Sequence, residues 1–210
     1  MPKVFFIFLF STFLIGCSPA ILFEEPQPPD TKELIEFPEK LHGDYQSLSN
    51  SSVLQISKNA IVRVYDFNFK EHINDLDTNL KLSGDTLIDL KIGDKMIVQV
   101  IDDTIYQGFY SVDTLFLISQ TNVLKKYKGH YFLSSTFDTM TWEVKKLSLN
   151  KLNLVISRIS GKEDLELLKE ITETQTDTAS FNFKPTQKQF KKFMKQNGFN
   201  DTEEFIRLKK

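Results

Sequence analysis

The sequence lacks most of the residues and motifs from which known kinds of functional site are built. It holds one cysteine, Cys17, in 210 residues, so no disulfide can form within the chain. It contains no Gly-x-Ser-x-Gly, no His-Glu-x-x-His and no glycine-rich loop that could cradle a phosphate. These absences argue against the common classes of serine hydrolase, zinc peptidase and nucleotide-binding enzyme.

The chain also lacks a strong net charge. It carries 26 basic and 28 acidic residues, a formal net charge of −2, and such a balance argues against a nucleic-acid partner. The charge is nevertheless placed unevenly. Residues 184–210 hold eight basic and three acidic residues, whereas residues 17–183 have a net charge of −8. This asymmetry singles out the C-terminal segment as a possible contact surface for an acidic partner.

Metal-ligating patterns are missing as well. His42 and His130 flank glycines of expected strands, and no cysteine or carboxylate stands at metal-ligand spacing from either. We therefore expect neither a metal nor another cofactor.

The one continuous apolar run lies at the N-terminus. It extends from Val4 to Ile15, about 12 residues, and follows the single positive charge of Lys3. A helix that spans a bilayer needs about 20 such residues. The run therefore suits the hydrophobic region of a signal peptide better than a permanent membrane span.

The end of this run, Leu14-Ile15-Gly16-Cys17, resembles the lipobox of bacterial lipoproteins. The resemblance implies that residues 1–16 are removed and that Cys17 is acylated on sulfur and nitrogen, which anchors the protein stably in a membrane. No aspartate stands directly after Cys17, where the sorting rule of bacterial lipoproteins places the signal for the inner membrane. The resemblance therefore implies the outer membrane and its periplasmic face, with surface display as the alternative. An ordinary signal peptide with an incidental cysteine is the other interpretation.

Residues 17–40 are expected to form a tether. Five prolines interrupt this segment, which blocks helix and sheet and favours an extended chain. At about 3.1 Å per residue, such a tether could reach roughly 70 Å from the membrane. The alternative is that Ile21-Leu22-Phe23 docks on the domain or on a partner.

Residues 41–160 alternate between apolar and polar side chains and predict a mainly β, antiparallel domain of about ten strands. We expect it to be a meander that closes into a barrel or folds into two packed sheets. A Gly-x-aromatic strand at Gly43 and Tyr45 is faintly similar to that of lipocalins. The expected strands after this one are 52–56, 60–65, 79–83, 86–91, 95–101, 104–111, 114–120, 122–128, 130–137, 140–148 and 151–159.

Residues 161–210 are expected to form two or three small helices packed on the β domain. Ser160 and Glu163 suggest a capping box for the first helix, and Thr186 suggests the start of the second. Asp201-Thr202-Glu203-Glu204 suggests the cap of a third. The apolar positions expected to pack on the sheet are Phe190, Phe193, Met194, Phe199, Phe205, Ile206 and Leu208.

These features favour a non-enzymatic, lipid-anchored binding or scaffolding protein of the cell envelope. Its expected partners are the membrane, through Cys17, and an envelope protein or cell-wall polymer that contacts the basic helix. The alternative is a lipocalin-like carrier with an apolar ligand in its barrel. A carrier requires an interior cavity, a scaffold requires a filled core with an exposed patch, and an enzyme requires convergent polar groups in a cleft.

Overall fold

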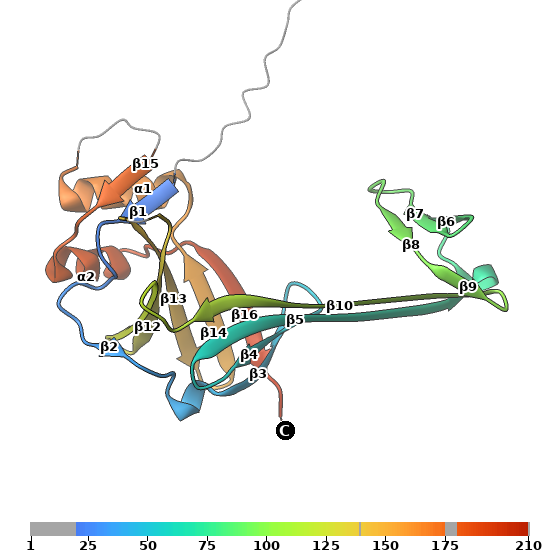
Figure 1. The fold of residues 1–210 in the computed structure, drawn as a ribbon. Coiled ribbons are helices and arrows are strands. Elements are labelled where there is room, and N and C mark those ends of the chain that lie inside the picture. The colour runs from blue at the N-terminus through green and yellow to red at the C-terminus, as the bar shows by residue number, and fades with distance from the viewer. Residues whose placement is uncertain (1–19, 139, 175–179, 210) are drawn as a thin grey trace, which may run out of the picture.

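A computed structural model describes residues 20–138, 140–174 and 180–209 (Figure 1). The chain is mainly β with antiparallel sheets, as the alternation predicts, and the described residues contain two α-helices. The expected number of about ten strands is too low, because the described residues form sixteen. The extra strands are short or come from segments that were expected to be tether, linker or helix.

Thirteen strands form the main sheet, and eleven of them follow one hydrogen-bonded path. In spatial order these are β2 (Glu33–Leu34), β11 (Asn122–Tyr127), β12 (His130–Thr136), β13 (Trp142–Asn150), β14 (Asn153–Arg158), β16 (Asp201–Arg207), β3 (Gly43–Ser47), β4 (Ser52–Ile56), β5 (Ala60–His72), β10 (Thr104–Leu117) and β9 (Gln99–Ile101). The path from β2 to β9 is open, and the sheet folds over its own core to form the body of the protein (Figure 1). Fourteen buried side chains fill that core, including Tyr45, Leu54, Tyr131 and Phe205.

Two helices cover the opposite face of the sheet. They are α1 (Gly161–Thr172) and α2 (Gln187–Lys195). Successive side chains of a strand point to opposite faces, so Phe132 of β12 meets the helices while its neighbours Tyr131 and Leu133 enter the main core. Phe190, Phe193 and Phe199 are buried in the helical layer, as expected from their spacing.

The third helix expected at the C-terminus is wrong, because these residues form β16 in the middle of the sheet, between β14 and β3. Burial alternates along β16, with Phe205 fully buried and Glu204 and Ile206 exposed. Local helix signals were overridden because β14 and β3 both offer unpaired edges, and the core has room for the ring of Phe205.

The N-terminal segment also differs from the expected tether. Strand β1 (Ala20–Phe23) pairs in parallel with β15 (Ser180–Phe183), and Phe23 is buried beneath the helices. The prolines that follow lie against β11, where the buried ammonium group of Lys125 donates hydrogen bonds of 2.7 and 3.0 Å to the carbonyls of Pro26 and Pro28. Burial lowers the pKa of Lys125. The docking alternative for Ile21-Leu22-Phe23 is therefore the one that the structure contains.

A long two-stranded arm leaves the body. Strands β5 and β10 pair over their whole lengths, from Ala60 opposite Leu117 to His72 opposite Thr104. Between them, residues 73–103 form the tip of the arm, which contains the short helix η2 (Ile73–Asp75), strand β9 and a small sheet of β6 (Leu80–Ser83), β7 (Thr86–Asp89) and β8 (Lys95–Ile97). In Figure 1 this small sheet folds back over the ribbon, so the arm ends in a hook.

The start of α1 is capped differently from the expected box. The side chain of Ser160 makes no cap hydrogen bond. Instead, the buried carboxylate of Asp164 accepts hydrogen bonds from the backbone N–H groups of Ser160, Phe199 and Asn200, and from the Asn200 side chain. This carboxylate joins the start of α1 to the loop after α2 through hydrogen bonds.

A short helix, η1 (Glu39–Leu41), lies before β3.

Gly198, in the same loop, permits a close approach. A Cβ atom there would lie 2.4 Å from Cζ of the Phe193 ring. We expect Gly198→Ala to lower the free energy of unfolding by about 1–3 kcal/mol through overpacking, as measured by urea denaturation. Phe193→Leu should relieve the clash, so the double variant should lose less stability than the two single losses combined. Strictly additive losses would contradict this cause.

Candidate functional site

The hook encloses an apolar groove of about 710 Å³. One wall is the small sheet of the tip, and the other is the face of the β5–β10 ribbon beneath it. Groove volumes of this size are typical of ligand sites in proteins. The lining residues are Phe67, Leu80, Leu87, Asp89, Ile92, Asp94, Lys95, Met96, Ile97, Gln107 and Phe109.

The register of the ribbon places the aromatic floor of this groove. Phe67 of β5 lies directly opposite Phe109 of β10, so both rings occupy the same face. Two residues further along, Phe69 lies opposite Gln107 and packs under the tip sheet. This face of the ribbon therefore packs against the tip sheet at the end far from the body. Nearer the body, the same face forms the floor of the groove.

A separate small core holds the tip sheet on the ribbon. Leu87, Val98 and Ile105 are buried there, with Phe69 and Leu80 packed against them. Because this core joins the tip to the ribbon, the groove has a fixed wall that does not depend on the body. A two-stranded ribbon without such packing would be marginally stable in water.

Exposed apolar side chains gather on the arm. Of the eighteen large hydrophobic residues that are exposed in the described ranges, ten lie between residues 67 and 112. Ile97 is 75% exposed, Phe109 52% and Tyr110 70%. Scattered exposed apolar residues are ordinary, but a concentration of this kind marks an interaction surface.

The tip is acidic. Residues 73–103 contain seven aspartates and three lysines. Asp89 and Asp94 line the groove together with Lys95, and the Asp89 carboxylate also accepts a hydrogen bond from the backbone N–H of Lys91. The groove thus combines an apolar floor with a mainly negative rim.

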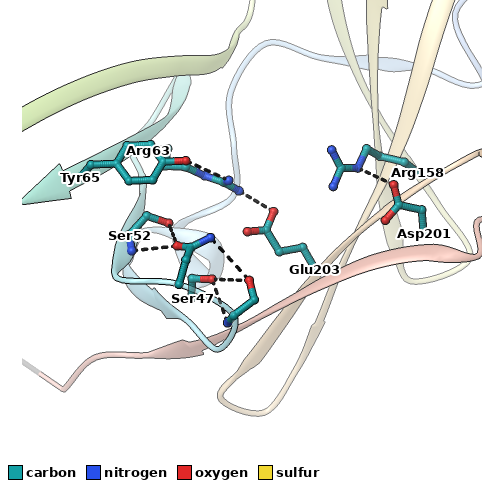
Figure 2. A network of polar contacts seen from close by, with 9 residues as sticks. Ser47, Ser52, Arg63, Tyr65, Arg158, Asp201 and Glu203 are labelled. Atoms are coloured by element: carbon teal, nitrogen blue, oxygen red, sulfur yellow. Dashed lines mark hydrogen bonds and ion pairs between the residues drawn. The ribbon is translucent and has the colours of Figure 1, made fainter. Parts of the chain in front are cut away.

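The base of the arm is fixed by a polar network inside the body (Figure 2). The guanidinium group of Arg63, on β5, donates to the carboxylate of Glu203, on β16, at 2.5 Å and also donates to the hydroxyl of Tyr65. The two charged side chains are 15% and 13% exposed. Burial alone would lower the pKa of Arg63, but these hydrogen bonds and the charge of Glu203 raise it overall. The pair therefore links the arm to the C-terminal strand.

A second ion pair joins β16 to its other neighbour in the body, β14. Arg158 of β14 contacts Asp201 of β16 at 3.1 Å and lies beside the first pair (Figure 2). Nearby, Ser52 donates to the side chain of Asn50, and the hydroxyls of Ser47 and Ser49 share a hydrogen bond. These contacts occur within the turn between β3 and β4, and we assign them a structural role.

The sites expected from the sequence lie elsewhere. Cys17 and the rest of the lipobox fall outside the described residues. On α2, Lys188, Lys192 and Lys195 are exposed while Phe190 and Phe193 face the sheet. No group of three or more His, Cys, Asp or Glu side chains in the described ranges is placed to hold a metal ion. Neither α-helix of those ranges has the length and apolar character needed to span a membrane.

Comparisons with known proteins found no matching family model, no matching curated protein and no matching solved structure. The groove residues were missed at the sequence level because most of them lie in ordinary strand patterns. The available signal was the apolar stretch from Met96 to Ile101, interrupted only by Gln99, together with Phe67-Asn68-Phe69 just before a segment rich in aspartate.

We expect the Arg63–Glu203 pair to stabilise the junction between arm and body. Arg63→Met should lower the free energy of unfolding by about 2–4 kcal/mol, because it leaves a largely buried carboxylate without its partner. Lys58→Met is the matched control, since the Lys58–Glu36 pair is far more exposed and should contribute about 0–1 kcal/mol. The measurement is urea denaturation of both variants, and equal losses would contradict the assignment.

Proposed function

We propose that this protein is a lipid-anchored binding protein of the cell envelope, without catalytic activity, that captures a partner in the groove of its arm. One observation carries the proposal: a large apolar groove with exposed aromatic and aliphatic side chains lies at the end of a projecting ribbon. An arm of this kind contributes little to the core of the body. Exposure of its apolar surface to water is unfavourable, and a bound partner that covers this surface lowers the free energy.

The interior of the body supports binding at the arm rather than carriage inside a barrel. The cavity lined by Arg63, Leu133, Glu203 and five further residues of the sheet measures about 90 Å³. Sites for drug-sized ligands are about 300–1,000 Å³. Large side chains, including Tyr45 and Tyr131, fill the core instead, which counts against the lipocalin-like alternative.

The anchor belongs to the same proposal. The lipobox resemblance implies acyl chains on Cys17, and the absence of an aspartate directly after Cys17 implies the outer membrane and its periplasmic face. Strand β1 begins at Ala20, three residues after Cys17, and three residues span at most about 11 Å. The body would therefore lie close to the bilayer, and the arm would provide the reach that a long tether was expected to provide.

The basic surface of α2 is a second contact in this proposal. Its apolar side packs on the sheet, and the exposed lysines 188 and 195 are available to anionic headgroups or to an acidic cell-wall polymer. Lys192 is also exposed, but it lies 3.7 Å from the carboxylate of Glu170. At 0.1 M salt, attraction between these lysines and anionic groups is largely screened at distances beyond about 10 Å. We assign α2 a role in orienting the anchored body and assign partner capture to the arm.

Anchoring can be tested by replacing the acylated residue. Cys17→Ser should abolish incorporation of a labelled fatty acid and leave an uncleaved or soluble precursor in cell fractionation. The unchanged chain, expressed in the same cells, serves as the control. Labelling that persists in the variant would exclude Cys17 as the lipidated residue.

Partner capture can be tested by excising the arm. Tyr65 and Ser111 form a cross-strand pair, so an Asn-Gly turn in place of residues 66–110 should close the hairpin there. We expect formaldehyde to form high-mass adducts with the intact protein in cells and not with the excised one, whose body should keep its melting temperature within about 5 °C. Ile35→Ser, on the body, is the control that should retain them. Adducts that survive excision would move partner binding away from the arm.

A further inference from the structure

The inner edge of the small sheet is an unpaired strand. β8 is the last strand of that sheet and pairs only with β7 among the described residues. The backbone N–H of Val98 donates to Asp85, and that of Asp89 donates to Asp94. Bonded pairs alternate along an antiparallel ladder, so Met96 pairs with Leu87 and directs its backbone groups toward β7.

The intervening residues of β8 direct their backbone groups the other way. The N–H and C=O groups of Lys95 and Ile97 point away from β7. Beyond Val98 the chain continues as β9, which pairs with β10. β8 therefore separates from β10 at this point, and the groove opens between the edge of β8 and the aromatic face of the ribbon.

Such an edge is a template for another strand. Free backbone donors and acceptors on an apolar strand favour pairing with an added chain, and natural sheets usually block such edges. All three residues of β8 and all three of β9 are exposed. An added strand would place alternate side chains into the groove, against Phe67 and Phe109, and the others toward solvent.

Charge indicates what kind of strand fits. Asp89 and Asp94 stand at the groove, and the tip as a whole has four more negative than positive charges. A second copy of this chain would bring an equally acidic tip against the first, which electrostatic repulsion disfavours. A segment that carries Lys or Arg between apolar residues would complement both the floor and the rim.

We infer that the edge of β8 binds an extended segment of another envelope protein by strand addition, and that this segment alternates apolar residues with Lys or Arg. The inference rests on the proposed function and specifies the partner class for the same groove. Affinity comes from backbone hydrogen bonds to Lys95 and Ile97, and specificity comes from the groove and its aspartates.

The test uses the full-length protein in its own cells, with a photo-crosslinking amino acid in place of Met96, which lines the groove. Into this background we introduce Ile97→Pro, which removes an N–H that does not pair with β7, and proline is tolerated at such edge positions. Ile97→Thr keeps the N–H and is the matched control. Lys95→Pro provides a second, independent deletion on the same edge. Slow amide exchange at Val98, bonded to Asp85, reports that the tip remains folded.

The expected result is an adduct that maps to an alternating apolar and basic segment of a second protein. Its yield should fall about tenfold in both proline variants and stay within about twofold in Ile97→Thr. Adducts with unchanged yield in the proline variants, or adducts to a helical segment, a lipid or a second copy of this chain, would overturn the inference while leaving the groove as a binding site. A second variant carries the same crosslinking amino acid in place of Phe109, which also lines the groove. The absence of any adduct from both probes would overturn the proposed function as well.

Discussion

The pairing of the last strand, β16, between β14 and β3 is the constraint on which the rest of the structure depends. It joins a meander built from residues 43–117 to one built from residues 122–158. Phe205 fills the core between them, and Glu203 binds Arg63 at the base of the arm. Because β16 supplies a ladder on both sides, the body closes only when the end of the chain is in place.

Alternation of apolar and polar residues was enough to predict a mainly β, antiparallel fold, because period-two burial is a direct consequence of strand geometry. The turn between Ser57 and Ala60 and the starts of β7 and β10 lie where the sequence placed them. The start of α2 at Thr186 was also predictable, and the structure adds a reciprocal cap between Thr186 and Gln189. These are local features, and local chemistry decides them.

What could not be predicted depends on partners that are distant in the sequence. β16 carries helix-favouring residues and becomes a strand only because the edges of β14 and β3 are both open to pairing with it. The arm was missed for a similar reason. The sequence predicts two strands, 104–111 and 114–120, with a turn at Asp113 between them. The structure has one strand there, β10, which shifts its register on β5 between Thr114 and Phe116. The groove follows from that continuity, because a turn at Asp113 would have kept Phe109 close to the body.

The arm also bears on how the sequence can change. Only two strands cross from the body to the tip, and the tip keeps its own small core around Leu87, Val98 and Ile105. Substitutions around the groove therefore leave the packing of the body unaltered, and substitutions in the body leave the groove intact. The body and the tip are separate packing units, so the groove can change its residues, and with them its specificity, without a change in the fold of the body.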